Sequence, residues 1–246
     1  MRNVDPGALY GRDAELLLLR RKLAARESFL LHGEAGVGKT RLLQSVLPDF
    51  SAILYTAAAK SPQSLFRLLA NALLARQDDA VLSRLKRATV ESKSALSLKG
   101  IVLDALRAGG YCVVLDQLQR PSQAMAAAVR EIVATETPAV CVARSAHMED
   151  AGHLLPLYPF RQERLEIKPF DLKTAALFAG EVAQRMHLEA GNGEEFLERV
   201  VAYSKGNPGI ILALLGKAAQ PEYLAGSHIK ISPLYIDFRL EWNARR

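Results

Sequence analysis

The chain has 246 residues, of which 50% are hydrophobic and 24% are charged. This is an ordinary globular composition, and the length allows one sizeable α/β core plus a small second domain. No apolar run is long enough to span a bilayer and the first residues lack the apolar segment of a signal peptide, so we expect a cytoplasmic protein without a membrane partner. The formal net charge of +6 permits an anionic partner such as DNA or RNA but does not require one.

Strands and helices are predicted to alternate along the first two thirds of the chain. Short apolar runs predict five strands, at 28–32, 51–55, 111–115, 139–143 and 165–167. Helical spacing of apolar residues predicts helices at about 13–25, 39–46, 62–76, 93–108 and 123–134. Such alternation is typical of a parallel sheet with helices on both faces, and we predict a five-stranded α/β core over residues 1–168.

The pattern changes after Pro169. Apolar residues at helical spacing predict three further helices without an intervening strand, at about 171–187, 194–204 and 208–218. We therefore expect a small all-helical lid domain over 169–220. The remaining tail, 221–246, alternates apolar and polar residues within 228–240, which would suit strands that Pro233 interrupts or places at an edge.

The two cysteines, Cys112 and Cys141, each lie in an apolar run of an expected strand. Because a metal site needs more ligands than lie near them, we predict two reduced thiols in the core.

The most informative motif is GEAGVGKT at positions 33–40, which matches G-x-x-x-x-G-K-[ST] between a predicted strand and a predicted helix. Glycines allow backbone N–H groups to surround phosphate oxygens, and the N-terminus of the following helix adds partial positive charge. Lys39 would reach the β- and γ-phosphates, and the Thr40 hydroxyl would bind Mg²⁺. The motif predicts ATP or ADP with Mg²⁺, bound by Gly33, Glu34, Ala35, Gly36, Val37, Gly38, Lys39, Thr40 and Arg41. The sequence contains no evident N-K-x-D motif for guanine, which favours adenine.

Two polar residues follow the apolar run at 111–115. An acid at the carboxyl end of a parallel strand lies where ligands bind, so we expect Asp116 to hold Mg²⁺ together with Thr40. Many ATPases of this kind place a glutamate directly after that acid, but here the position holds Gln117. A glutamine can orient water but is a poor general base, so we predict slow hydrolysis unless another carboxylate or a partner contributes.

Three arginines lie near the ends of predicted strands. Arg144 follows the run at 139–143 and is a candidate sensor of the γ-phosphate. Arg161 and Arg164 precede the last core strand, where either would be able to act across a subunit interface. The alternative for each of the three is an ordinary surface arginine.

With these motifs in order, the chain resembles the AAA+-like P-loop ATPases, nearest to the STAND nucleotide switches and the archaeal and origin-recognition-type ATPases. The segment LYGRDAE at 9–15 resembles an entry box that lies against the adenine, which implies that Tyr10, Gly11 and Arg12 bind nucleotide. The segments at 141–145 and 165–178 resemble the sensor 1 strand and the lid entry. The turn GNP at 206–208 resembles one whose proline, here Pro208, touches nucleotide from the lid.

The chain departs from this family at Gln117. STAND proteins normally continue into a winged helix and sensor repeats, so we expect this sequence of 246 residues to be either a compact family member or the ATPase module of a longer protein. The resemblance implies a nucleotide-dependent conformational or assembly switch, which would form homo-oligomers with ATP bound and act on a protein partner that the sequence does not identify. In such a switch ATP would hold the lid through Pro208 while Arg144 reads the γ-phosphate.

Two other functions remain open. The first is a DNA-binding ATPase of the transposition-helper or loader type, which oligomerises on duplex DNA. Its support is the positive charge and a basic stretch, formed by Arg76, Arg84, Lys86, Arg87, Lys93 and Lys99. The second is a scaffold that keeps its nucleotide without hydrolysing it, which Gln117 would favour.

Overall fold

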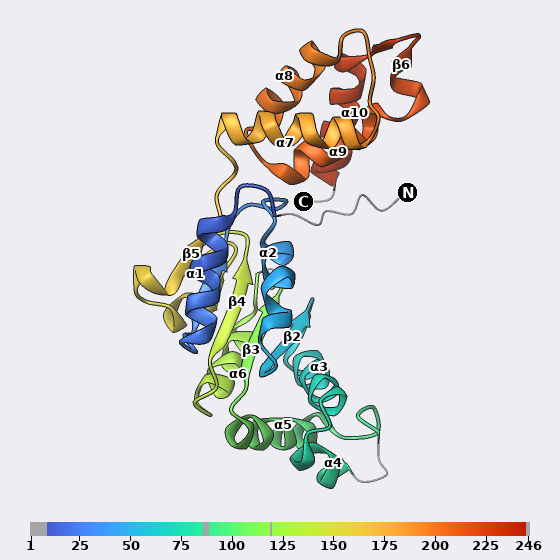
Figure 1. Cartoon of the computed structure of the whole chain (residues 1–246). Helices are drawn as coiled ribbons and strands as arrows, with labels where there is room; N and C mark the ends of the chain where they lie inside the picture. Colours follow the sequence, from blue (N-terminus) through green and yellow to red (C-terminus); the bar gives the residue numbers. More distant parts are fainter. Residues whose placement is uncertain (1–8, 86–88, 119, 245–246) are drawn as a thin grey trace. The chain divides into compact units, whose positions relative to one another are not determined.

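The computed structural model describes residues 9–85, 89–118 and 120–244, and it divides into two compact units (Figure 1). The sheet unit comprises Ala14–Gly33 and Lys39–Ile167. The helical unit comprises the described residues up to Asp13, the loop Glu34–Gly38 and the described residues from Lys168 onward. The GEAGVGKT motif therefore contributes residues to both units.

The sheet unit is organised around a parallel sheet of five strands in the order β2-β3-β4-β1-β5. The strands are β1 (Phe29–His32), β2 (Ile53–Ala57), β3 (Cys112–Asp116), β4 (Ala139–Ala143) and β5 (Arg164–Glu166). Every residue of β3 and β4 is buried, as expected for continuous apolar runs in a sheet that is covered on both faces. The predicted five-stranded parallel sheet is confirmed.

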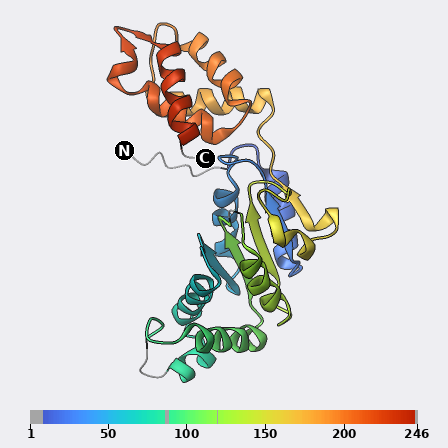
Figure 2. The ribbon, with the colours of Figure 1, turned by 180° about the vertical axis from the view of Figure 1, so that it is seen from behind.

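Helices cover both faces of this sheet. The helices of the sheet unit are α1 (Asp13–Ala24), α2 (Lys39–Val46), α3 (Pro62–Ala75), α4 (Asp79–Leu85), α5 (Ala95–Gly109) and α6 (Gln123–Val133). Figures 1 and 2 show α2 and α6 on opposite faces. The reason is the topology, because the connections from β1 to β2 and from β3 to β4 cross the sheet in opposite directions and right-handed crossovers then place their helices on opposite sides.

One of these helices, α4, was not predicted. It has seven residues and lies in the polar, basic stretch after α3, but it buries Val81 and Leu85. In so short a segment, whose other apolar residues are Ala80 and the exposed Leu82, the pattern is too weak to distinguish a helix from a loop.

Both cysteines lie in the core of the sheet unit. Cys112 and Cys141 are free and buried. Burial raises the pKa of the Cys112 thiol to about 11 and that of Cys141 to about 12. The prediction of two reduced core thiols is confirmed, and among the described residues no group of histidine, cysteine and acidic side chains is arranged to hold a metal ion.

The described part of the helical unit contains four α-helices, which are α7 (Leu172–Arg185), α8 (Gly193–Ser204), α9 (Pro208–Ala218) and α10 (Ile231–Ala244). Side chains from all four helices share one apolar core, including Ala179, Phe196, Ile211, Leu214 and Phe238. This unit therefore has a hydrophobic core of its own.

The C-terminal tail differs from the sequence expectation. The strands allowed for residues 228–240 are limited to the short hairpin of β6 (Leu224–Ala225) and β7 (His228–Ile229), and α10 begins at Ile231. Pro233 lies in the first turn of α10, where its missing N–H leaves no helical bond unmade. The alternation of the sequence was misleading because Leu234 and Phe238, four residues apart, are buried on one side of a helix.

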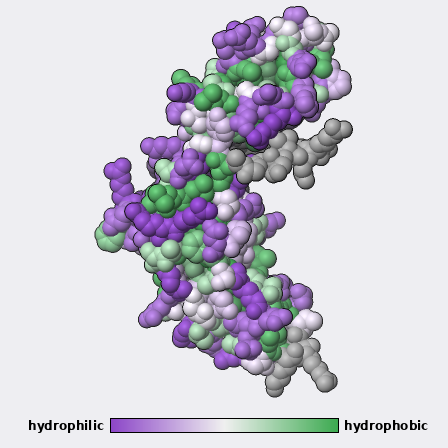
Figure 3. Space-filling model, in the orientation of Figure 1, coloured by the Kyte–Doolittle hydropathy of each residue, from purple (hydrophilic) through white to green (hydrophobic). Residues whose placement is uncertain are grey.

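The described helices include none that is long and apolar enough to cross a membrane. On the face drawn in Figure 3, hydrophilic side chains predominate and hydrophobic side chains gather in separate small groups.

The core of the sheet unit gives a test of its packing. Leu69 of α3 is fully buried, so Leu69→Ala should lower the free energy of unfolding by about 2–5 kcal/mol through lost burial and the remaining cavity. Leu96 of α5 is 79% exposed, and Leu96→Ala should change stability by less than about 0.5 kcal/mol. Guanidinium unfolding of the two variants measures both values, and equal losses would contradict the packing described.

Candidate functional site

The GEAGVGKT loop leaves the end of β1 and enters α2 at Lys39. Gly36 and Gly38 have φ values of 90° and 98°, which side-chain-bearing residues rarely adopt. These two glycines allow successive peptide groups of the loop to turn. The loop backbone therefore has the left-handed φ values that the glycines of the motif allow.

Lys39 and Thr40 form the first turn of α2, and both are partly exposed. The Lys39 ammonium group donates to the carbonyl oxygen of Gly33 at 2.5 Å, so it lies back along the start of the loop. In the sheet unit the lysine and the hydroxyl of the motif are therefore next to each other at a helix N-terminus, where the partial positive charge favours anions.

His32, the last residue of β1, was not singled out from the sequence. Its pKa is lowered chiefly by burial and further by the positive charges of Arg164 and Lys39, while Glu166 opposes this shift. A neutral imidazole therefore precedes the loop, and the positive charge at this strand end comes from Lys39.

Asp116 ends β3 with only 1% of its surface exposed. Its carboxylate accepts a hydrogen bond from the Tyr55 hydroxyl at 2.8 Å and another from the Gln117 N–H at 2.7 Å. These bonds fix the carboxylate and leave other lone pairs for a cation. Burial, followed by the hydrogen bond to Asp116, raises the pKa of Tyr55 well above its ordinary value. The sequence pattern contained no signal for the part played by Tyr55.

The sheet order brings three of the predicted residues to neighbouring strand ends. In the sequence of strands β3-β4-β1, Asp116 ends the first, Arg144 follows the second and the motif follows the third. Neighbouring strands are about 5 Å apart, so Asp116 lies about 10 Å across the sheet from the end of β1. Arg144 follows β4, the strand between these two, and is partly buried.

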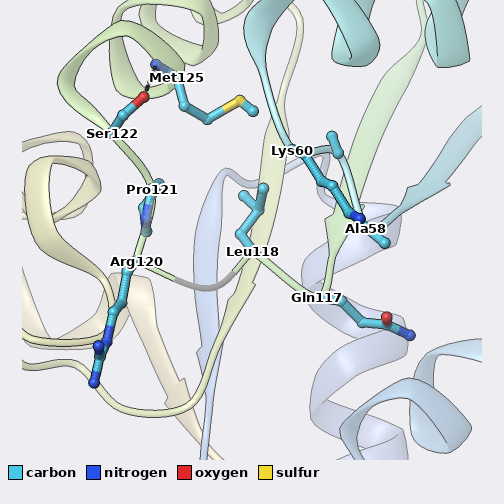
Figure 4. A pocket seen from close by; sticks show the side chains of 9 residues that line it. Ala58, Lys60, Gln117, Leu118, Arg120, Pro121, Ser122 and Met125 are labelled. Carbon is cyan, nitrogen blue, oxygen red and sulfur yellow. Dashed lines mark hydrogen bonds between the residues drawn. The ribbon is translucent and has the colours of Figure 1, made fainter.

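Gln117 is exposed and lines a pocket of about 380 Å³ at the ends of β2 and β3. Figure 4 shows Gln117, Ala58 and Lys60 on one side of this pocket and Arg120 and Ser122 on the other. Three of the lining residues, Ala58, Gln117 and Arg120, have left-handed φ values of 55°, 58° and 47°. Strained backbone of this kind is concentrated at functional sites.

Residues of the predicted entry box pack within the helical unit. Arg12 is buried, and its guanidinium donates to the carbonyl oxygens of Lys168 at 2.7 Å and Val37 at 3.2 Å. It also lies 4.5 Å above the ring of Phe170. Arg12 therefore connects the loop to the start of the lid segment.

The other two entry-box residues lie against α7. The ring of Tyr10 lies 5.8 Å from that of Phe178 of α7 and is tilted by 51° to it. Gly11 lies so close to Thr174 that an added Cβ would meet its methyl group at 2.8 Å.

The start of α9 contacts the loop in the same unit. Pro208 is buried as the first residue of α9. Asn207 caps the helix and donates from Nδ2 to the carbonyl oxygen of Ala35 at 2.9 Å, and the N–H of Gly209 donates to the carbonyl oxygen of Gly36 at 3.0 Å. An asparagine before a proline does predict a helix cap, but nothing in the sequence reveals these two contacts.

Three of the other candidate cations have partners. Arg164 donates to the carbonyl oxygen of Tyr158 at 2.8 Å, whereas Arg161 is exposed. In the basic stretch, Arg84 pairs with Asp104 and Lys99 with Glu131.

Two further members of the basic stretch, Lys86 and Arg87, lie outside the described residues. Arg76 donates to the carbonyl oxygen of Ile53, and Lys93 is partly buried. The described part of the stretch therefore offers less unpaired positive charge than the sequence suggested.

The chain is similar to known ATPases. The family model described as AAA ATPase domain matches residues 8–143, and no curated protein matches. The Orc1 protein of Aeropyrum pernix, solved in complex with DNA, is similar over 98% of this chain and 68% of its own, with 18% identity and a TM-score of 0.67. A Walker-type ATPase of Pyrococcus abyssi is similar over 97% and 76%, with 18% identity and a TM-score of 0.63.

A STAND protein with a tetratricopeptide repeat sensor, from Pyrococcus horikoshii, is similar over 96% of this chain but 33% of its own, with 13% identity and a TM-score of 0.51. At such identities these likenesses concern the fold. Together with the family match, they confirm the predicted fold class, which is a P-loop ATPase core of the AAA+ type followed by helices.

The hydrogen bond between Tyr55 and Asp116 predicts a pH effect. Because the pKa of Tyr55 is raised in the folded protein, its contribution to stability is complete below about pH 10, the ordinary tyrosine pKa, and is lost as the pH rises further. Tyr55→Phe should therefore lower stability at pH 7 by about 1–3 kcal/mol, because Asp116 loses a buried partner.

The deficit of Tyr55→Phe relative to the unaltered protein should shrink above pH 10. Urea unfolding of both proteins between pH 7 and 11 checks this expectation. A deficit that stayed constant over this range would show that the tyrosine proton does not contribute.

Proposed function

Because the chain belongs to the AAA ATPase domain family, we propose that it binds ATP with Mg²⁺ and acts as a nucleotide-dependent conformational or assembly switch with slow hydrolysis. The observation that carries this proposal is the division of the GEAGVGKT motif. Glu34–Gly38 belong to the helical unit, whereas Gly33 and Lys39 belong to the sheet unit. ATP bound to the loop is therefore expected to act on the start of α9, which contacts Ala35 and Gly36 within the helical unit.

The residues of the motif suit a magnesium nucleotide. Backbone N–H groups of the loop and the Lys39 ammonium would hold phosphate oxygens, and the Thr40 hydroxyl and the Asp116 carboxylate would hold Mg²⁺ directly or through water. N–H and ammonium groups donate hydrogen bonds to phosphate, and hydroxyl and carboxylate oxygens are the ligands that a hard cation requires. Glycine at positions 36 and 38 leaves no side chain inside the turn. When bound, MgATP supplies a phosphoanhydride bond that water can cleave to give ADP.

The remaining predicted nucleotide contacts stay part of the proposal. Tyr10, Gly11 and Arg12 would border the base, with Arg12 acting mainly through the carbonyl oxygens that it holds. Pro208 would approach from α9. We also propose that the helical lid extends beyond the expected 169–220 and includes the tail, because Leu234 and Phe238 of α10 lie in the same core.

Slow hydrolysis is supported by the side chains beside Asp116. Gln117 can orient a water molecule through its amide, but it does not accept a proton as a glutamate would. Arg144 follows the neighbouring strand and would stabilise negative charge that develops on the γ-phosphate. Release of phosphate is therefore expected to be slow or to depend on a partner.

A DNA-binding ATPase is the second candidate. Its support is the net charge of +6 and the similarity to an Orc1 protein that was solved with DNA. The paired charges of Arg84 and Lys99 weigh against the basic stretch as a strong phosphate-binding surface. Sizing by light scattering with ATP or ADP, with and without duplex DNA, tests both candidates. Assembly with ATP alone supports the switch, assembly only with DNA supports the alternative, and a constant monomer supports a nucleotide-holding scaffold instead.

Removal of the motif lysine tests nucleotide binding itself. Lys39→Ala should raise the Kd for MgATP about 10- to 100-fold, because a hydrogen bond from a charged donor is worth about 1.5–3 kcal/mol. Calorimetric titration measures the Kd, and Lys173→Ala on the exposed side of α7 is the matched control. Unchanged affinity in Lys39→Ala would remove the basis for the proposed function.

Replacement of the glutamine tests the cause of slow hydrolysis. Gln117→Glu keeps the size of the side chain and supplies a carboxylate, so phosphate release should rise at least about 10-fold. A coupled phosphate assay measures the rate, with Gln184→Glu on α7 as the control. An unchanged rate would mean that the missing base is not what limits hydrolysis.

A further inference from the structure

We propose that Asn207 and Gly209, at the start of α9, are positioning residues for phosphate binding. They turn the peptide groups of the loop so that its N–H groups, rather than its carbonyl oxygens, are presented to an anion. This inference rests on the proposed function and assigns to α9 a part in it that does not require contact with the nucleotide.

Asn207 has one defined side-chain orientation. Its Oδ1 atom accepts from the N–H groups of Gly209 at 3.1 Å and Ile210 at 3.4 Å, which caps α9. Because the oxygen of the amide is used in this way, its Nδ2 group faces the carbonyl oxygen of Ala35 at 2.9 Å. The side chain is 1% exposed, so water does not replace this bond.

Gly209 brings the backbone of α9 into direct contact with the loop. Its N–H donates to the carbonyl oxygen of Gly36 at 3.0 Å. A Cβ atom at position 209 would lie 2.7 Å from the Cα of Gly36 and 2.8 Å from its oxygen, so both positions need glycine for the contact to form.

The planarity of the peptide bond turns these contacts into a constraint on the N–H groups. In a trans peptide the C=O and the next N–H point in opposite directions. With the Ala35 carbonyl held by Asn207, the N–H of Gly36 points away from α9. With the Val37 carbonyl held by Arg12 at 3.2 Å, the N–H of Gly38 likewise points away from Arg12.

In the intervening peptide the contact keeps the carbonyl oxygen away from an anion, while the N–H is used within the loop. The carbonyl of Gly36 is held by Gly209, and the N–H of Val37 closes a turn onto the Glu34 oxygen at 3.4 Å. A reversed peptide at any of these positions would present a carbonyl oxygen to a phosphate and repel it. The loop is thus held ready for an anion by residues of the helical unit.

A purely structural reading would make Asn207 only the cap of α9. The two readings differ in what a loss of the contact changes. A cap affects the stability of the helical unit, whereas a positioning residue affects the affinity for phosphate beyond any change in stability.

Two glycines of α9 provide a matched test in the whole chain. An added Cβ at Gly216 meets nothing within 4 Å, whereas one at Gly209 meets Gly36. Gly209→Ala should therefore raise the Kd for MgATP at least about 10-fold, while Gly216→Ala leaves it unchanged; both replacements favour a helix. Calorimetric titration gives the Kd, and thermal unfolding without nucleotide gives the stability.

Asn207→Ser is the second variant, because serine keeps the helix cap but is too short to reach Ala35. Its control is Asn192→Ser, which removes bonds of 2.9 Å and 2.8 Å to Ile229 within the same unit. Asn207→Ser should weaken MgATP binding about 5- to 10-fold, while Asn192→Ser lowers the Tm without altering the Kd.

The outcomes separate the two proposals. If the unaltered protein fails to bind MgATP, the proposed function fails. If it binds, but Asn207→Ser binds as tightly as Asn192→Ser and a folded Gly209→Ala as tightly as Gly216→Ala, the positioning role is overturned. If Gly209→Ala does not fold, the pair of asparagine variants decides.

Discussion

Hydrogen bonds to three consecutive carbonyl groups are the constraint on which the site depends. The carbonyl oxygens of Ala35, Gly36 and Val37 accept from Asn207, Gly209 and Arg12, respectively. Because each peptide is planar, these bonds decide where the N–H groups point. The glycines of the motif make the turn possible, but by themselves they would leave the peptides free to reverse. The helical unit removes this freedom from the loop that is expected to hold phosphate.

The charged and hydroxyl side chains that we propose for the phosphates and Mg²⁺ belong to the sheet unit. The parallel order β3-β4-β1 places Asp116, Arg144 and Lys39 at neighbouring strand ends, although they are far apart in the sequence. The buried bond from Tyr55 then fixes the Asp116 carboxylate. Position 117 in the same region holds a glutamine where a glutamate would supply a general base, and this supports the slow hydrolysis that we propose.

The features that could be predicted from the sequence are those set by local patterns. Continuous apolar runs defined the strands, and fixed glycine spacing defined the loop. The bonds from Tyr55 to Asp116 and from Asn207 to Ala35 join residues 61 and 172 positions apart, so no local pattern contains them. The tail was misjudged because a short apolar–polar alternation also suits a helix that buries every fourth residue. Residues 231–244 form the helix α10 because its apolar side chains pack into the helical core, rather than because of local propensity.

The most direct measurement is the amide NMR spectrum of the protein labelled with ¹⁵N at glycine, titrated with MgATP. The chain has 16 glycines, so the loop signals can be resolved and assigned by substitution. The account predicts that the amide protons of Gly36 and Gly38 move downfield as they bond to phosphate, while those of Gly180 and Gly216, which lie in the open on α7 and α9, stay in place. Saturable binding of MgATP that left Gly36 and Gly38 unmoved would contradict it.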